Sequence, residues 1–368
     1  MIDDTRSIES FKKETFSGYK KTDVYKALFK SIDSKKYEES SNWLVECIIS
    51  GYTCQIWEKL CLYASKFIHI NNTNLPIYIY KKNILFQNIV NSYKCNINKE
   101  NILLLRNNET IKNLMASLLY LLITSEKIKI FKQVKLSNLD FSMQNVDKRL
   151  KSTHNILPES FIHMNEPDEL RMIMNEIYFN LQNNTYGYDH VIYWIDWLLK
   201  WEKMNKNMTW NIDDRNVSVD KKYRSDIIWI LWNIIHIEKN KRDKIIINNI
   251  NSLYQLYIHS YSKSKKNLRL PYIYNSIALL TYDIKNKPIL KDIIGYIQIQ
   301  INIDKIFKVK NIKSVKNEKV DNIDINKIIN DEKDKERKKK KVRPELEKIN
   351  NNINIFNELN SNLYNINI

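Results

Sequence analysis

Apolar side chains spaced three and four residues apart dominate residues 35–68, and this spacing constrains the fold more than any other feature of the sequence. Such steps place side chains on one face of an α-helix. Gly51 separates two such stretches, and glycine readily adopts the positive φ that ends a helix. We therefore expect a helical hairpin with its turn at Gly51. The residues that carry the pattern are Tyr37, Leu44, Cys47 and Ile48 before the turn, and Ile56, Trp57, Leu60, Cys61, Ala64, Phe67 and Ile68 after it.

Helix-capping residues support this interpretation. Ser34 and Thr53 precede the two stretches, and each has an oxygen that can accept from the unpaired amides of a first helical turn. Pro76 suits the first turn of a third helix, where its missing N–H is not needed. Similar stretches continue to about residue 310. The sequence thus predicts an all-α fold, either an irregular multi-helix bundle or an α-solenoid-like array of helical hairpins, with a disordered basic C-terminal tail.

Three regions are expected along the chain. Residues 1–150 form an N-terminal bundle around the stretch 109–125, which is apolar nearly all round and is therefore surrounded by other helices. Two prolines in residues 151–167 mark the boundary. Residues 167–310 form a second bundle, and residues 311–368 form a flexible, charged and Asn-rich tail.

The chain is strongly basic, with 59 Lys and Arg against 42 Asp and Glu and a net charge of +17. Residues 331–368 hold nine basic and seven acidic side chains, so most of the excess lies in residues 1–330. Such charge attracts nucleic acid, acidic proteins or anionic membranes. Lys, Asn and Ile crowd the sequence, so A/T-rich codon usage is an equally good explanation of the excess.

Two basic segments are candidate nucleic-acid contacts. One is a predicted loop in residues 262–269, and the other is a charge run in the tail that resembles a nuclear-import signal. A solvated flexible tail is the alternative interpretation of the second. The candidate residues are Lys263, Lys265, Lys266 and Arg269 in the loop, and Arg337, Lys338, Lys339, Lys340, Lys341 and Arg343 in the tail.

Tryptophans divide into core and interface candidates. Trp194, Trp197 and Trp201 follow helical spacing, which favours packing in a core over stacking on bases. Trp210 lies in a polar loop and is expected to be exposed, for base stacking or for an interface. The hairpin is expected to serve packing or oligomerisation, with Trp43 and Trp57 as its interface residues.

The sequence contains no motif for catalysis, for cofactor binding or for metal binding. With only four glycines, the chain has no glycine-rich phosphate loop and no G-x-S-x-G turn, so we predict no catalytic residues and no cofactor. His163, Glu166 and Asp168 are the only local group of potential metal ligands, and zinc requires more, so no metal is predicted. The four cysteines lack a C-x-x-C pair, fit a reducing compartment and resemble small core residues. The longest apolar run, around residues 114–123, is too short to span a membrane.

A set of motifs along the chain carries a resemblance to known proteins. They are residues 16–24 (FSGYKKTDV), Trp43, Ser50, Gly51, Trp57, Leu75 and Pro76, then residues 226–232 (DIIWILW) and 253–257 (LYQLY). In these motifs the chain resembles a family of uncharacterised helical proteins of large nucleocytoplasmic DNA viruses, over residues 11 to about 310. The resemblance implies a viral setting, in the host cytoplasm, the nucleus or the virion, and it implies no activity.

A shorter likeness lies within residues 38–76. The residues that carry it are Trp43, Leu44, Ser50, Gly51, Ile56, Leu60, Ala64, Ser65, Ile68 and Leu75. They resemble the helical collar, or oligomerisation, domain of clamp-loader-type AAA+ ATPases. The chain departs from that family because it has no G-x-x-x-x-G-K-[ST] loop to hold ATP phosphates.

Three classes of function follow. The first is a non-enzymatic helical interaction protein that acts in DNA replication, transcription or genome handling through a basic surface. Its partners would be DNA, RNA, an acidic protein or a second copy of the chain. The second is a virion structural or assembly protein. The third is an enzyme without a recognisable motif.

Overall fold

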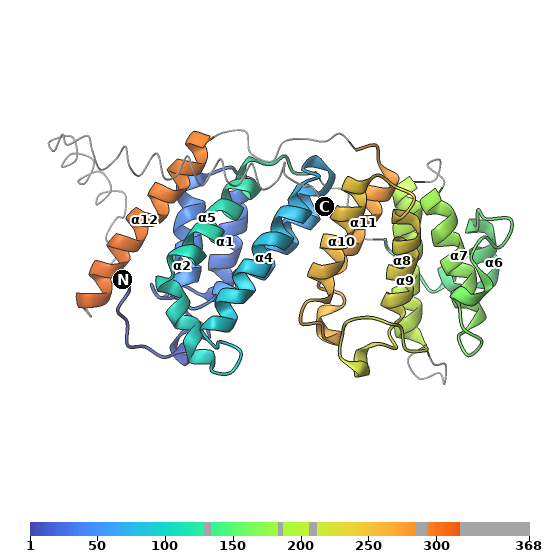
Figure 1. Cartoon of the computed structure of the whole chain (residues 1–368), viewed down its shortest axis with the longest axis horizontal. Coiled ribbons are helices and arrows are strands. Elements are labelled where there is room, and N and C mark those ends of the chain that lie inside the picture. Colours follow the sequence, from blue (N-terminus) through green and yellow to red (C-terminus); the bar gives the residue numbers. More distant parts are fainter. Residues whose placement is uncertain (129–133, 183–186, 206–211, 285–292, 317–368) are drawn as a thin grey trace. The chain divides into compact units, whose positions relative to one another are not determined.

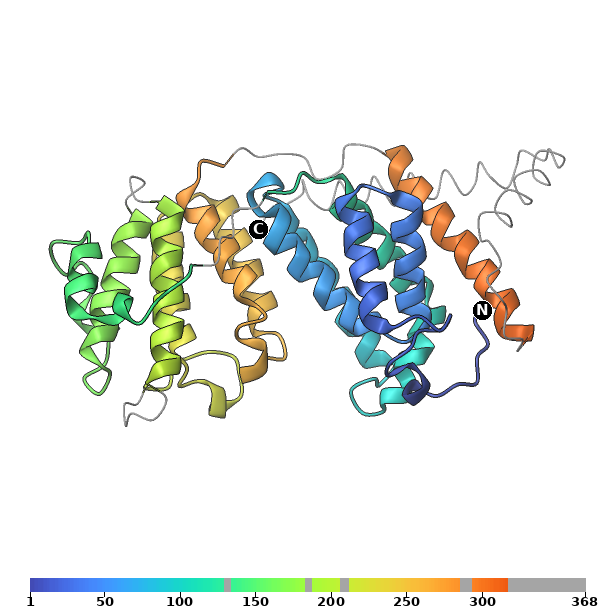
Figure 2. The ribbon, with the colours of Figure 1, turned by 180° about the vertical axis from the view of Figure 1, so that it is seen from behind.

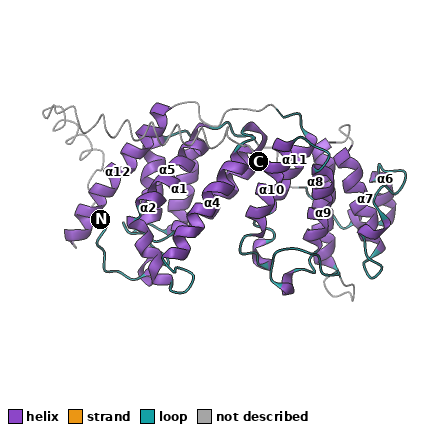
Figure 3. Ribbon diagram, in the orientation of Figure 1, coloured by secondary structure: helices purple, strands orange, loops and turns teal. Residues whose placement is uncertain are grey.

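The computed structural model describes residues 1–128, 134–182, 187–205, 212–284 and 293–316. Within these ranges the chain is helical (Figure 3), and its only β pairing is an isolated antiparallel bridge between Glu14 and Lys20. The predicted all-α class is therefore confirmed.

The helices form two compact units. Unit 1 comprises Met1–Leu60, Lys82–Ser125 and Pro288–Ile368, and unit 2 comprises Cys61–Lys81 and Glu126–Lys287. The chain therefore leaves unit 1 twice and returns to it twice.

This division differs from the predicted one, which separated residues 1–150 from residues 167–310. Residues 61–81 belong to unit 2, and the helix α12 (Ile293–Lys316) belongs to unit 1. Buried residues of α12, such as Ile299 and Ile303, explain the second difference, because this helix packs against α2 and α5. The helix also extends into the predicted tail as far as Lys316.

Unit 1 contains the predicted hairpin as far as Leu60, and the rest of the hairpin, from Cys61, belongs to unit 2 (Figure 1). Its turn is at Gly51, which has a φ of +74°. The predicted caps are wrong: Ser34 ends α1, and Thr53 is the first residue of α3. The elements that lie wholly in this unit are η1 (Ile8–Phe11), α1 (Lys21–Asp33), α2 (Tyr37–Ile49), η4 (Lys99–Asn107), α5 (Glu109–Thr124) and α12. Two further helices belong to it only in part: α3 (Thr53–Tyr63) as far as Leu60, and α4 (Leu75–Ser92) from Lys82 onward.

The core of unit 1 surrounds α5, as its all-round apolar sequence predicts. Every residue from Leu114 to Ile123 is buried. Helices α1, α2 and α12 all contact α5. Burial of apolar surface stabilises a fold by ~25 cal/mol for each Å² removed from water. Because α5 is buried almost all round, its side chains are a principal source of the stability of unit 1.

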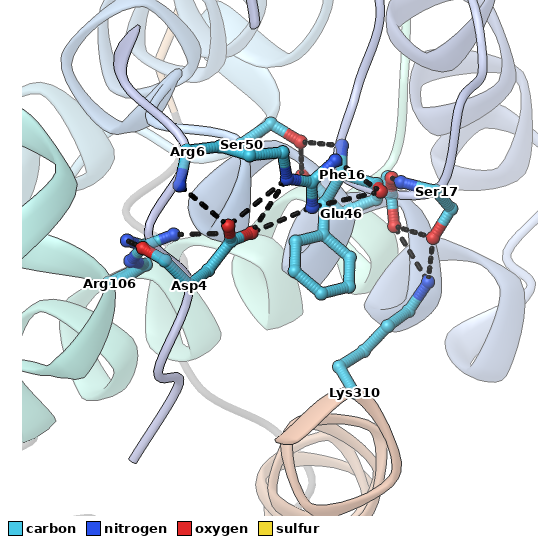
Figure 4. A network of polar contacts seen from close by, with 8 residues as sticks. All are labelled: Asp4, Arg6, Phe16, Ser17, Glu46, Ser50, Arg106 and Lys310. Carbon is cyan, nitrogen blue, oxygen red and sulfur yellow. Dashed lines mark hydrogen bonds and ion pairs between the residues drawn. The ribbon is translucent and has the colours of Figure 1, made fainter. Parts of the chain in front are cut away.

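A buried polar network joins α12 to the N-terminal segment (Figure 4). The Lys310 ammonium lies 2.8 Å from the Glu46 carboxylate and also donates to the Ser17 hydroxyl. Glu46 accepts from the Ser17 amide at 2.7 Å. Burial alone would raise the pKa of Glu46, but Lys310 and these donors hold it below its usual value. The carboxylate is therefore ionised and paired inside the unit.

Unit 2 is built largely from helical hairpins, seen from the opposite side in Figure 2. Helix α7 packs on α8, α10 packs on α11, and α9 contacts α7, α10 and α11. The elements of this unit are the π-helical turn η2 (Ala64–Ile68), η3 (His69–Asn71), η5 (Leu139–Phe141), α6 (Met143–Arg149), η6 (Glu159–Phe161), α7 (Asp168–Gln182), α8 (Gly187–Met204), η7 (Lys221–Tyr223), α9 (Ile227–Lys239), α10 (Lys244–Ile258), η8 (Lys263–Lys265) and α11 (Leu270–Thr281).

The predicted core tryptophans lie on α8. Trp194 and Trp197 are buried, and Trp201 is partly exposed. The ring of Phe141 stacks on Trp197 at 5.0 Å, and the Trp197 indole N–H donates to the carbonyl of Asp140 at 2.9 Å. The prediction of core packing is confirmed for Trp194 and Trp197.

Candidate nucleic-acid interface

The predicted basic loop connects α10 to α11, and only part of its charge faces solvent. Lys263 is exposed and Lys265 is half-buried. Lys266 and Arg269 are only 5% and 3% exposed, so the expectation that all four side chains form a surface is corrected.

Lys266 and Arg269 fix the loop from within. The Lys266 ammonium lies 2.7 Å from the Glu202 carboxylate and 2.5 Å from that of Asp226. Arg269 donates to the carbonyls of Tyr257 and His259 at 2.7 and 2.5 Å. These carbonyls lie at the C-terminal end of α10, where a helix carries partial negative charge and favours a cation. Both charges therefore stabilise the folded loop.

A second lysine-bearing segment lies beside this loop. Residues 212–226 connect α8 to α9 and lie at the same end of unit 2 (Figures 1 and 2). The rings of Tyr223 and Tyr261 are 5.7 Å apart, and the indole of Trp229 donates to the Tyr223 carbonyl at 2.6 Å. Lys221 and Lys222, just before this tyrosine, are exposed. Packing therefore gathers lysines that are about 40 residues apart in the sequence.

We call Lys203, Lys221, Lys222 and Lys263 the lysine end of unit 2. All four are exposed, and none forms an ion pair within the described ranges. The nearby carboxylates Glu202 and Asp226 are both engaged by Lys266. The exposed charge around these lysines is therefore mainly positive, although Asp214 and Asp220 of the same segment are also exposed.

Apolar side chains accompany these lysines. Met204 and Leu268 are 51% and 53% exposed, and the half-buried ring of Tyr223 has the Lys222 ammonium 5.0 Å from its centre. Exposed lysines beside apolar and aromatic groups are typical of surfaces that bind single-stranded nucleic acid.

A compact ion network supports the 212–226 segment. Glu166 is buried and accepts from the Arg215 guanidinium at 2.6 Å through both oxygens. The two ring nitrogens of His163 lie 2.8 Å from Asp213 and 2.5 Å from Arg215. The Arg215 amide donates to the Arg224 carbonyl at 3.1 Å. Both nitrogens of the His163 ring therefore take part in this network.

No arrangement for metal binding was found in the described part of the chain, where three or more His, Cys, Asp or Glu side chains never converge suitably. In the described residues, Cys47, Cys54, Cys61 and Cys95 form no disulfide, and three of them are buried. Burial raises the pKa of Cys54 to about 12, so this thiol is unreactive at neutral pH.

The two hairpin tryptophans that were predicted at an interface, Trp43 and Trp57, differ in their burial. Trp57 is only 2% exposed: its ring stacks on Phe86 at 4.7 Å and its indole N–H donates to Asn83 at 2.9 Å. Its predicted interface role is therefore corrected to core packing. Trp43 is half-buried beside the exposed ring of Tyr19 and stays an interface prediction.

The remaining predicted contacts lie outside the described residues. They are Trp210, Arg337, Lys338, Lys339, Lys340, Lys341 and Arg343.

The sequence missed Lys203, Lys221 and Lys222. The pair Lys221-Lys222 was visible, but two adjacent lysines are common in this chain. Only the contacts of Tyr223 and Lys266 show that these residues share a surface with Lys263.

Fold and surface together describe an all-helical protein with a lysine-rich end. Comparison of the chain with protein-family models, with curated proteins and with solved structures found no match. Among the helices described, none has both the length and the apolar character needed to cross a bilayer.

Proposed function

We propose that this chain is a non-enzymatic helical interaction protein that contacts nucleic acid through the lysine end of unit 2. The observation that carries the proposal is the burial of Lys266 between Glu202 and Asp226. This arrangement occupies two neighbouring carboxylates and leaves four exposed lysines that form no ion pair with the residues the structure describes.

The chemistry of these lysines supports phosphate contact. Lysine ammonium groups on flexible stems bind phosphates as point charges and do not require one fixed geometry. Each phosphate neutralised releases counterions, so binding weakens as salt rises. Four contacts correspond to a slope of about −3 in log K against log salt, by the usual 0.7–0.9 per phosphate. Because contacts to backbone phosphates carry no sequence information, we expect little sequence preference.

The viral part of the proposal rests on sequence resemblance alone. It would set the binding in viral DNA replication, transcription or genome handling.

Fluorescence anisotropy with labelled single- and double-stranded DNA and RNA tests the proposal. The full chain and a chain ending at Asn330 would be measured across a salt series. We expect both to bind with a steep salt slope. Binding that disappears with the tail would move the site to the tail and contradict the lysine end.

A matched pair of variants locates the site. Replacing Lys203, Lys221, Lys222 and Lys263 together by Gln should weaken binding at least about tenfold and lower the slope by about 3. The control replaces Lys30, Lys99, Lys135 and Lys148, which are also exposed, by Gln. Equal losses in the two variants would mean that net charge, rather than this surface, drives binding.

A further inference from the structure

A second unpaired cationic cluster lies on unit 1, where two lysines share one tyrosine ring. The ammonium groups of Lys21 and Lys59 lie 6.0 and 5.1 Å from the centre of the Tyr25 ring. Lys21 also lies 4.1 Å from the centre of the Tyr52 ring. The cluster thus joins the first turn of α1 to α3.

Helix geometry positions this cluster. Lys21 and Tyr25 are four residues apart on α1, and Gln55 and Lys59 are four apart on α3, so each pair lies on one helix face. The Tyr25 hydroxyl and the Gln55 amide oxygen are 3.1 Å apart and connect the two faces. The lysines are therefore held at defined positions.

Tyr52 anchors the cluster to the interior. Its hydroxyl donates to the carbonyls of Phe11 and Glu14, at 2.5 and 3.0 Å. Its ring packs edge-on against Tyr25 with centres 5.9 Å apart. The aromatic base under Lys21 is therefore part of the folded unit and not a mobile surface group.

The charge of this cluster is not neutralised. In the described ranges neither Lys21 nor Lys59 forms an ion pair with a carboxylate. Burial, together with repulsion from Lys59, lowers the pKa of Lys21. An added anion would relieve this repulsion.

Two further lysines border the cluster. The Lys21 amide donates to the Lys13 carbonyl at 3.0 Å, and Lys20 precedes Lys21 in the chain. Lys13 and Lys20 are both exposed. The adjacent carboxylates are Glu14, which is exposed, and Asp23, which lies 3.8 Å from Lys26. Positive charge therefore exceeds negative charge at this end of α1.

We propose that Lys21 and Lys59, bordered by Lys13 and Lys20, bind backbone phosphates of a nucleic-acid strand, as a second contact surface carried by unit 1. Phosphate is the expected contact because the Tyr25 ring already receives two ammonium groups and is not offered to a base. This surface extends the proposed function to unit 1, and its residues are separate from the lysine end.

The test replaces Lys21 and Lys59 by Gln in the full chain, both alone and combined with the fourfold lysine-end variant. Anisotropy with a labelled single-stranded DNA oligonucleotide should show at least about fivefold weaker binding. The salt slope should fall by a further 1.4–1.8, which is about 0.7–0.9 for each of two phosphates. The Lys21→Arg, Lys59→Arg variant should retain binding, because it keeps both charges.

Controls separate charge from folding. Replacing Lys30 and Lys99 by Gln removes the same charge from other exposed positions and should change binding less than twofold. Circular dichroism melts identify any variant that unfolds, and the Arg variant then decides the question: binding retained supports the proposal, and binding lost overturns it.

The outcomes for the two surfaces are distinguishable. Weakening by the lysine-end variant but not by the Lys21, Lys59 variant overturns this inference alone. The reverse result supports it and overturns the assignment to the lysine end. Failure of the unchanged chain to bind any nucleic acid overturns both. Binding to phosphatidylserine vesicles that needs Lys21 and Lys59, with DNA binding unchanged, also overturns it.

Discussion

Gly51 shows how a single residue determines the close packing of unit 1. Its φ of +74° lies in the left-handed region, which residues with a Cβ rarely adopt. A Cβ added there would lie 2.7 Å from Leu103 Cδ2 and 2.8 Å from Ile8 Cδ1. The backbone conformation therefore favours glycine, and a larger residue would also have to displace the side-chain ends of Leu103 and Ile8.

Gly51→Ala should therefore destabilise the protein. We expect a loss of about 2–5 kcal/mol in the free energy of unfolding, from roughly 1–2 kcal/mol of backbone strain and 1–3 kcal/mol of overpacking. Urea unfolding measures it.

Gly18→Ala is the matched control. Gly18 has a φ of +82°, but no atom lies within 4 Å of an added Cβ. Gly18→Ala should therefore lower the free energy of unfolding only by the backbone contribution, about 1–2 kcal/mol. Equal losses in the two variants would contradict the packing role of Gly51.

Residue-level inference from sequence succeeded where the cause was local. The turn at Gly51 and the burial of Trp194 and Trp197 follow from spacing within one or two helices. The burial of Lys266 could not be predicted, because one of its carboxylate partners, Glu202, lies 64 residues earlier in the chain. Trp57 was expected at an interface. Helical spacing shows that Trp57 lies on the apolar face of its helix, but it does not show which residues cover that face.

At the scale of elements, α12 depends on one buried ion pair as well as on apolar packing. The side chains of Lys310 and Glu46 are 4% and 1% exposed. Removing one member of such a pair leaves an uncompensated charge in the interior.

Lys310→Met should therefore lower the free energy of unfolding by about 3–5 kcal/mol. Combining it with Glu46→Met should cost clearly less than the sum of the two single changes, because no buried charge then remains unpaired. Chemical denaturation of the four chains of this cycle gives the coupling energy. Lys308→Met, at an exposed position of the same helix, should change stability by less than about 0.5 kcal/mol. Simple additivity would mean that the pair does not hold α12 in place.

Elements themselves were more predictable than their partners. Periodicity identified the hairpin and the buried α5 because both patterns repeat within a single segment. The predicted second bundle, residues 167–310, included most of α12, whereas this helix belongs to unit 1. The apolar residues of α12 could pack against any apolar helix face, so they do not identify its partner. Its polar residues identify the partner only in the folded unit, where the Gln300 amide donates to Asn113 at 3.3 Å.

For the whole molecule, the assignment of α12 to unit 1 makes a directional prediction. A chain that ends at Lys287 lacks α12, while one that ends at Lys316 retains it. Hydrogen exchange followed by mass spectrometry should show reduced protection in residues 37–49 and 109–124 of the shorter chain. Residues 168–182 and 244–258 should keep their protection, because α7 and α10 belong to unit 2. A uniform loss in both units would contradict the division described above.

The position of Lys310 also affects the order of events during synthesis. Glu46 and Lys310 are 264 residues apart, and ribosomes add about 5–20 residues per second, so roughly 13–53 s separate the two. Once Thr124 has been added, and until α12 is made, the nascent chain has the surfaces of α2 and α5 without their covering helix. Unit 1, although it begins first, is completed only after all of unit 2 has been translated. Ribosomes that stop before α12 would therefore release chains with exposed apolar surface, which are natural substrates for chaperones.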